Sequence, residues 1–124
     1  MQKVEVKDFL LQDTLVPIVD VRSPGEFVEG HIAGALNIPL FDDAERARVG
    51  TTYTQVGREE AIELGLEIVG PKMNALAKKA KSIGVEGKLK THCWRGGMRS
   101  EKMAWLFELM GLDVTVLTGG YKAF

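Results

Sequence analysis

The chain has 124 residues, a formal net charge of −1 and 45% hydrophobic residues, which is typical of one globular domain. This charge provides no overall attraction to nucleic acid, so any such contact must be local or lie outside the chain. No apolar run approaches the ~18 residues of a membrane span, and the N-terminus lacks the apolar core of a signal peptide. The single cysteine cannot form an internal disulfide. We therefore expect a soluble cytoplasmic protein without membrane contact.

Strand and helix patterns alternate along the chain. Pro17–Val21 is apolar and β-branched, as expected for a central strand that is buried on both faces. Ser23 and Pro24 have the residue types of a helix N-cap and first turn, so a helix is expected to begin there. Before this segment we predict a strand at 4–6 and a helix at 7–12. The helix that begins at Ser23 is expected to end near Gly30, and a strand is expected at 35–39. A helical segment at 42–70 with a break near Gly50 or Gly57 and a helix at 71–83 ending at Gly84 follow.

The last third of the chain continues this alternation. We predict a strand at 88–92, a helix from Met98 to Met110 that Gly111 ends, a strand at 114–117 and a turn at Gly119–Gly120. Strands separated by helices predict an α/β fold with a mainly parallel sheet covered on both faces. Open sheets of this kind place their sites at the C-terminal ends of the strands. Four residues are expected at that edge: Asp20, Pro39, Cys93 and Thr118.

The most informative segment runs from His92 to Ser100. It contains the only cysteine, Cys93, which five residues separate from Arg99. A strand–loop–helix junction containing two glycines directs backbone N–H groups and the positive end of the helix into one concavity. A thiol placed there is expected to ionise more readily than a free cysteine. This setting favours a nucleophile over the alternative, a small buried hydrophobic residue.

Two longer segments carry a resemblance to a known family. The segment from Asp20 to Pro39, which contains Asp-Val-Arg-Ser-Pro-Gly-Glu-Phe and His-Ile-Ala-Gly-Ala-Leu-Asn-Ile-Pro, resembles the N-terminal signature of rhodanese-like domains. The residues Thr-Gly-Gly-Tyr at 118–121 resemble the end of the same domain. The loop at 93–100 and the helical insertion at about 42–70 are similar to the N-terminal rhodanese domain of bacterial tRNA 2-selenouridine synthases.

This resemblance implies a three-layer α/β/α fold with a central five-stranded, mainly parallel sheet over residues 1–124. It also implies a cysteine that carries sulfur or selenium in the conversion of 2-thiouridine to 2-selenouridine at the tRNA wobble position. In that family a P-loop domain follows, and this sequence has no Gly-x-x-x-x-Gly-Lys-Ser/Thr run. We therefore expect the N-terminal domain alone, with tRNA bound mainly through the missing C-terminal domain.

The expected chemistry begins with attack of the Cys93 thiolate on an anionic donor: selenophosphate, selenosulfate or thiosulfate. The product is a persulfide or perselenide on the cysteine, and Arg99 is expected to hold the anion with the loop amides. No cofactor is expected in this domain, and no metal, because two histidines and one cysteine lack ligand spacing. Asp20 and Arg22 are expected to support the site. The residues assigned to the anion-binding loop are Trp94, Arg95, Gly96, Gly97 and Met98.

Two other functions are compatible with parts of this pattern. Cysteine, five residues, arginine and serine also match the cysteine-dependent phosphatases, whose cell-cycle members share the rhodanese fold. The loop is one residue longer than in common rhodaneses, which makes room for a tetrahedral phosphorus anion and therefore also suits selenophosphate. A phosphatase needs a carboxylic acid, which Asp42 or Asp43 supplies only if the insertion folds over the pocket. The remaining alternative is an inactive binding module, against which the intact Cys93 and Arg99 argue.

Several further side chains have structural interpretations. Asp20 is expected to be mainly structural, and Arg22 and Glu26 have the spacing of an ion pair. Trp94 is either a lid packed on the domain or a platform for a base. Trp105 lies in an apolar helix and is expected in the core. The basic cluster expected on a solvated face comprises Lys78, Lys79, Lys81, Lys88 and Lys90.

Overall fold

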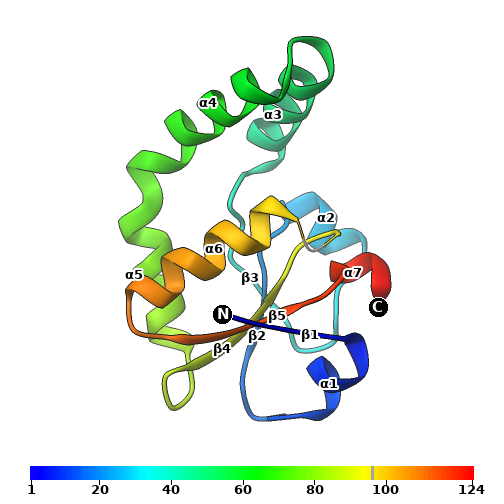
Figure 1. Ribbon diagram of the computed structural model, residues 1–124, viewed down its shortest axis with the longest axis vertical. Coiled ribbons are helices and arrows are strands. Elements are labelled where there is room, and N and C mark those ends of the chain that lie inside the picture. The colour runs from blue at the N-terminus through cyan, green and yellow to red at the C-terminus, as the bar shows by residue number, and fades with distance from the viewer. Residues whose placement is uncertain (96) are drawn as a thin grey trace.

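The computed structural model describes residues 1–95 and 97–124. No helix formed by these residues has both the length and the apolar composition that crossing a bilayer requires. In chain order the elements are β1 (Gln2–Val4), α1 (Val6–Leu11), β2 (Ile18–Asp20), α2 (Pro24–Glu29), β3 (Leu36–Asn37), α3 (Asp43–Gln55), α4 (Arg58–Val69), the 3₁₀ helix η1 (Gly70–Lys72), α5 (Met73–Ile83), β4 (Lys88–His92), α6 (Met98–Leu109), β5 (Asp113–Leu117) and α7 (Gly120–Ala123) (Figure 1).

The five strands form one parallel sheet in the order β1-β5-β4-β2-β3. The central strand is β4, which pairs with β2 on one side and β5 on the other. The predicted parallel sheet is confirmed. Because Cys93 directly follows β4, the cysteine loop leaves the sheet at its middle, beside the C-terminal end of β2.

Helices cover both faces of this sheet, as predicted. Successive residues of a strand point to opposite faces, so Ile18 and Val19 belong to two different apolar clusters. The larger cluster joins Val19 and Val116 to α5 and α6, with Phe107 fully buried. The smaller one joins Ile18 to α1, α2 and α7 around Phe9. The result is the expected α/β/α arrangement of layers.

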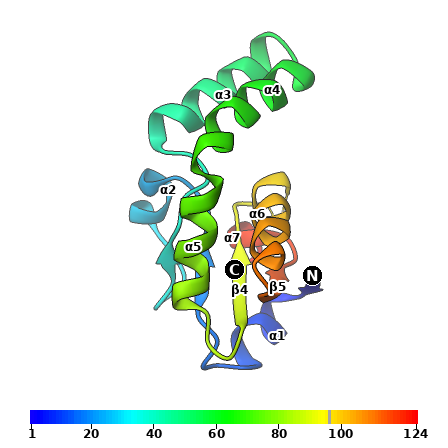
Figure 2. The ribbon, with the colours of Figure 1, turned by 90° about the vertical axis from the view of Figure 1, so that its left-hand side faces the viewer.

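Helices α3 and α4 form the predicted insertion and lie side by side as an arm that projects from the layered body (Figures 1 and 2). Asp42 and Glu45 form a capping box at the start of α3, with hydrogen bonds of 2.7 and 2.9 Å between side chains and backbone N–H groups. The break between the helices lies at Val56 and Gly57, the second of the two predicted positions. Gly50 continues α3.

The first strand begins and ends earlier than the predicted strand at 4–6. Val4 pairs with Leu117, the last residue of β5, and its carbonyl oxygen accepts a hydrogen bond from Thr118 N–H at 2.8 Å. No further β5 residue remains for Val6 to pair with. Glu5 instead becomes the N-cap of α1 and Val6 its first residue. Tertiary pairing thus overrides the local β pattern.

The expectation that Trp105 lies in the core is wrong. Helix α6 buries a stripe that includes Ser100, Met103, Ala104 and Phe107. These positions have the i, i+3, i+4, i+7 spacing of one helix face. Trp105 lies outside this stripe, and 54% of its surface is exposed.

Lys90 does not belong to the solvated basic cluster. Only 4% of its surface is exposed, and its Nζ donates to the carbonyl oxygens of Phe9 at 2.7 Å and Gln12 at 2.6 Å. These carbonyls lie at the C-terminal end of α1, which a cation stabilises. Burial lowers the pKa of Lys90, and the charge of Asp13 partly opposes this change. The four other lysines of the cluster are exposed, as expected.

Candidate active site

The cysteine loop lies at the predicted junction of strand, loop and helix. Cys93 follows the central strand directly, and α6 begins at Met98 with Gly97 as its N-cap. The first N–H groups of α6 lack partners within the helix, and the positive end of the helix dipole lies there. Met98 is exposed, as are the loop residues Trp94 and Arg95. Gly96, also assigned to the anion-binding loop, lies outside the described residues.

The thiol of Cys93 points inward, toward the first turn of α6. Its Sγ donates a hydrogen bond to Ser100 Oγ at 3.2 Å, and Ser100 Oγ donates to the Gly97 carbonyl at 3.2 Å. Cys93 is 3% exposed and Ser100 is fully buried. In the ionised state, the sulfur can accept a hydrogen bond from the same hydroxyl. Ser100 is a site residue that sequence reasoning missed, although the motif placed it directly after Arg99.

Arg99 is held by a carboxylate that the sequence did not assign to the site. Its Nη1 donates to Glu26 Oε1 at 2.7 Å and its Nη2 to Glu26 Oε2 at 3.4 Å. The contact links the N-terminal turns of α2 and α6, which are 73 residues apart in sequence. The role of Arg99 as an anion ligand remains a prediction, and its guanidinium already has one anionic partner.

Glu26 has several further partners. It accepts hydrogen bonds from the backbone N–H of Ser23 at 3.1 Å and from the Ser23 hydroxyl at 3.0 Å, and Arg46 Nε lies 3.8 Å from Oε1. Partial burial alone would raise the pKa of Glu26. The hydrogen bond and charge of Arg99, together with Ser23, outweigh burial and lower this pKa to about 2. Glu26 is therefore ionised at neutral pH and cannot serve as a general acid there.

Asp20 and Arg22 form a buried ion pair behind the loop. The Arg22 guanidinium donates to Asp20 Oδ2 at 2.7 Å and to the Gly30 carbonyl at 2.7 Å, and it lies 4.1 Å from the ring centre of Tyr121. The Arg22–Glu26 pair suggested by spacing does not form. Because Arg22 precedes α2, the two residues do not share a helix face as the four-residue spacing requires.

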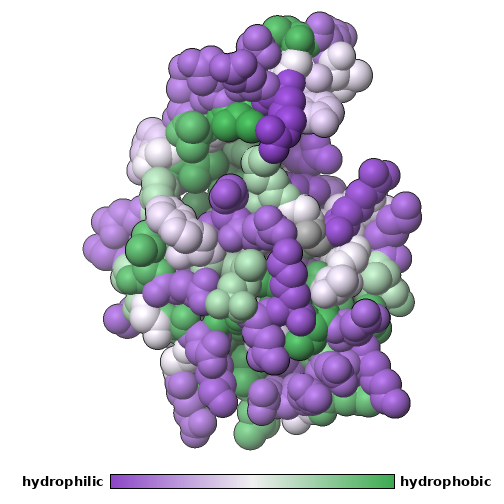
Figure 3. All heavy atoms as spheres, in the orientation of Figure 1, coloured by the Kyte–Doolittle hydropathy of each residue, from purple (hydrophilic) through white to green (hydrophobic). Residues whose placement is uncertain are grey.

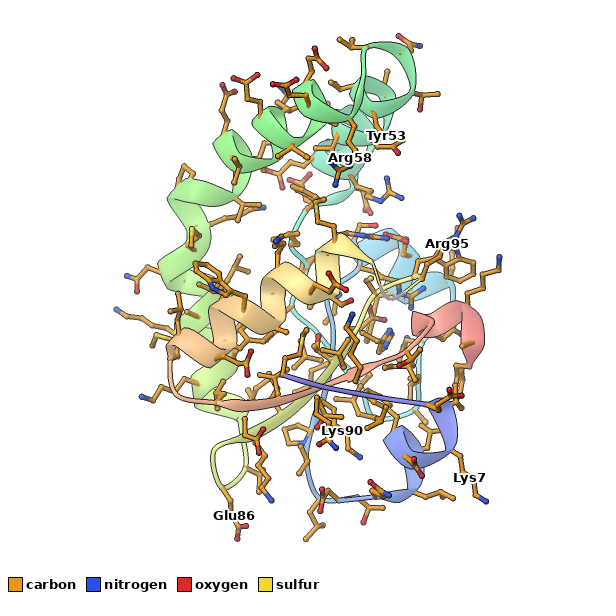
Figure 4. All side chains as sticks on the ribbon, in the orientation of Figure 1. Lys7, Tyr53, Arg58, Glu86, Lys90 and Arg95 are labelled. Atoms are coloured by element: carbon orange, nitrogen blue, oxygen red, sulfur yellow. The ribbon has the colours of Figure 1, made fainter. Side chains whose placement is uncertain are left out.

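The C-terminal helix α7 holds the backbone of the cysteine loop. The backbone N–H of Tyr121 donates to the Cys93 carbonyl at 2.7 Å, and that of Lys122 donates to the Trp94 carbonyl at 2.9 Å. The Trp94 ring packs against Tyr121 with 6.0 Å between ring centres and keeps 37% of its surface exposed. Arg95 extends outward from the loop (Figure 4). Asp20, through Arg22 and Tyr121, thus supports the segment that carries the thiol.

His92 is fully buried beneath this network. Its ring stands edge-on to Phe9, with 6.4 Å between ring centres, and stacks on Tyr121 at 6.1 Å. Its Nδ1 lies 3.2 Å from the Cys93 carbonyl oxygen, and its Nε2 lies 3.7 Å from Asp20 Oδ2. Burial lowers the pKa of His92, and Asp20 partly opposes this change. These contacts give His92 a packing role next to Cys93.

The two carboxylates considered as phosphatase acids are engaged elsewhere. Asp42 caps α3 by accepting from the Glu45 N–H at 2.7 Å, and Asp43 accepts from the Gly25 N–H at 2.8 Å at the start of α2. The insertion that begins with α3 projects as an arm from the layered body (Figure 1). Within residues 1–95 and 97–124, no three His, Cys, Asp or Glu side chains group as a metal site requires.

Comparisons with known proteins agree with this architecture. Residues 3–124 match the Rhodanese-like domain family. The tRNA 2-selenouridine synthase of Nitrosomonas europaea is 45% identical over 109 residues, which are 86% of this chain and 28% of that protein. The enzyme of the same name from Bordetella petrii is 42% identical over 120 residues, which are 94% of this chain and 32% of that protein. The chain thus spans about a third of the length of these relatives.

Solved structures show the same fold. The N-terminal domain of a protein described as ATP/GTP binding, from Clostridium difficile 630, has a TM-score of 0.91 at 37% identity, covering 98% of this chain and 95% of that one. A human single-domain sulfurtransferase has a TM-score of 0.57 at 20% identity, covering 99% and 94%, and this likeness supports the fold alone. Because the family match extends over nearly the whole chain and the sheet order, layers and cysteine loop are in place, this chain belongs to the rhodanese-like domain family.

Proposed function

We propose that this domain transfers sulfur or selenium through Cys93, as one step in converting 2-thiouridine to 2-selenouridine at the tRNA wobble position. The observation that carries the proposal is the position of the only cysteine, at the end of the central strand and before the N-terminus of α6. The identity to the N-terminal third of tRNA 2-selenouridine synthases supports the choice of acceptor. Modification of tRNA implies a cytoplasmic location and contacts with tRNA mainly through a further domain.

The first step is a displacement at sulfur or selenium. The Cys93 thiolate attacks the outer sulfur of thiosulfate, or the selenium of selenosulfate. A bond forms to that atom while its bond to the sulfonate sulfur breaks, and sulfite leaves with the electron pair. Cys93 then carries a persulfide or perselenide. Loop amides, the start of α6 and Arg99 stabilise the anion. Ser100 Oγ, which accepts from the neutral thiol at 3.2 Å, can turn its hydroxyl to donate to the thiolate.

The size of the loop also admits a tetrahedral phosphorus anion, which makes selenophosphate a third candidate donor. Attack of the thiolate on its selenium would break the Se–P bond, and phosphite would leave with the electron pair. The same loop length is the main argument for the alternative function, a cysteine-dependent phosphatase. The acids considered for that alternative, Asp42 and Asp43, already accept hydrogen bonds at helix N-termini, and Glu26 has a pKa of about 2. A chalcogen donor with sulfite as its leaving group needs no such acid.

Trapping the transferred atom with cyanide tests the proposal. The chain is incubated with each of the three donors and freed of excess donor by gel filtration, and cyanide is then added to release thiocyanate or selenocyanate from the loaded cysteine. We expect release with at least one donor, and none from the Cys93→Ser variant, whose hydroxyl is a far weaker nucleophile. A wild-type chain that releases neither product with any donor would show that Cys93 is not a chalcogen carrier.

A further inference from the structure

A groove beneath the arm is lined mainly by residues that have no part in the chemistry described above. Its volume is about 580 Å³, within the range of small-ligand sites. Figure 3 shows the hollow below the hydrophilic outer side of the arm, with hydrophobic residues on its wall. The wall comes from α3, α4 and the segment after β3, and its apolar members include Phe41, Val49, Ile62, Leu66 and Val69. An open apolar hollow of this size is typical of a binding surface.

The charged side chains that line the groove are all cationic. They are Arg46, Arg58, Arg99 and Lys102, and no carboxylate of the described residues lines it. Acidic residues outnumber basic ones by 17 to 16 in the whole chain, so this is a local concentration of positive charge. Arg46 Nε is buried without a hydrogen-bond partner among the described residues. Glu26, which does not line the groove, pairs with Arg99 and lies 3.8 Å from Arg46 Nε, whereas Arg58 and Lys102 form no ion pair with another described residue. These two cations favour an anionic occupant.

An aromatic ring lies beside these cations. Tyr53 lines the groove with 58% of its surface exposed, and Arg58 lies near it where the arm turns (Figure 4). An exposed ring provides a stacking surface for a base, and a guanidinium provides donors for a phosphate. A nucleotide contains both a base that can stack on Tyr53 and a phosphate that can accept from Arg58. An aliphatic anion, in contrast, would use the apolar wall and the charges but gain no stacking on Tyr53.

The groove is continuous with the cysteine loop. Met98 and Arg99 line it, and the next residue, Ser100, holds Cys93 Sγ. We propose that the groove binds a nucleotide of single-stranded RNA, with a base against Tyr53 and a phosphate at Arg58. The identity of this RNA as the acceptor rests on the proposed function. Binding in the groove and loading of Cys93 are nevertheless separate measurements.

Titration of the ¹⁵N-labelled chain with the trinucleotide UUU tests the groove directly. Backbone amide shifts should saturate and map to the turn of the arm and to Met98. Tyr53→Ala and Arg58→Ala should each weaken binding by at least about fivefold, the lower range for loss of one stacked base. Two matched variants should bind like the parent. Tyr53→Phe keeps the ring, and Arg48→Ala removes an exposed arginine of α3 that does not line the groove.

A control ligand separates a nucleotide site from a site for aliphatic anions. Octyl phosphate has a phosphate and an apolar tail but no base, and it should bind more weakly than UUU. Binding of octyl phosphate as tight as that of UUU would overturn the proposal, as would UUU shifts confined to the exposed lysine face of α5. The absence of any shift at roughly 5 mM UUU would also overturn it. The shift map uses the unaltered chain, so a variant that failed to fold would leave this test intact.

Loading of Cys93 is measured on the same preparation by mass spectrometry after selenosulfate treatment. A loaded cysteine without UUU binding would refute the groove assignment and leave the transfer function standing. UUU binding with no loading by any of the three donors would refute the transfer function and leave the groove assignment standing.

Discussion

Arg99 and Arg95 flank the same loop but differ in their surroundings. Arg99 is 15% exposed and paired with Glu26 at the start of α6, whereas Arg95 extends into solvent. We expect Arg99→Ala to slow chalcogen loading by about 100-fold, the usual effect of removing one donor to a developing anion, and Arg95→Ala to have much less effect. Initial rates of adduct formation, followed by mass spectrometry, compare the two. Equal losses, or an Arg99→Ala variant that loads normally, would show that the anion is held elsewhere.

Glu26 should make the stability of the domain depend on acid pH. Its pKa falls from 4.5 to about 2 on folding, so its contribution is present above about pH 4.5 and is lost as the pH falls toward 2. Glu26→Gln should therefore lower the free energy of unfolding most at neutral pH, and the difference from the parent should vanish near pH 2. Urea unfolding across this range measures it.

Glu29→Gln is the matched control for this experiment, because Glu29 lies on the same helix and is exposed. It should leave the pH dependence of unfolding close to that of the parent. A Glu26→Gln variant that keeps the same acid transition as the parent would contradict the ion pair with Arg99 as the cause.

At the scale of elements, the buried face of α6 predicts opposite outcomes for two neighbouring aromatic residues. Trp105→Gln should change the free energy of unfolding by less than about 0.5 kcal/mol, since the side chain is largely exposed. Phe107→Ala should cost about 3–5 kcal/mol, because Phe107 is fully buried in the larger core cluster. Denaturant unfolding of both variants measures the difference. A large loss for Trp105→Gln would mean that α6 buries a different face from the one described here.

Elements that local residues define could be predicted well. The bounds of β4 match the prediction, and α2 begins after Ser23 and ends before Gly30 as its cap residues indicate. Gly111 follows the end of α6 with φ of 89°, the left-handed conformation that favours glycine at this position. In such places the signal lies within a few residues of the feature, so the sequence alone is sufficient.

Features that depend on distant partners could not be predicted in this way. The second half of α6 is apolar on nearly every side, so hydrophobic periodicity did not indicate which face is buried, and Trp105 was misassigned. Glu26 and Arg99 are 73 residues apart, and only the packing of α2 against α6 brings them together. Lys90 has the sequence context of an exposed lysine, yet it caps a helix 78 residues away in sequence.

At the scale of the whole molecule, the charge of the chain limits its affinity for tRNA. With a net charge of −1 and only four of its 16 lysines and arginines in the groove, the isolated domain should bind tRNA with a Kd weaker than about 1 µM at physiological salt. Fluorescence anisotropy with labelled tRNA at several salt concentrations measures this. Sub-micromolar binding by this chain would mean that its own surface supplies most of the phosphate contacts.

The identity of the group that remains on Cys93 tests the central claim most directly. After exposure to thiosulfate, selenosulfate or selenophosphate, intact-mass analysis should show one added sulfur or selenium that dithiothreitol removes. Aryl-phosphate turnover should be negligible, because Glu26 has a pKa of about 2 and Asp42 and Asp43 accept hydrogen bonds at helix N-termini. Aryl-phosphate turnover of roughly 1 per second or more, within the ordinary enzyme range, together with no chalcogen adduct, would contradict the account and identify a phosphatase.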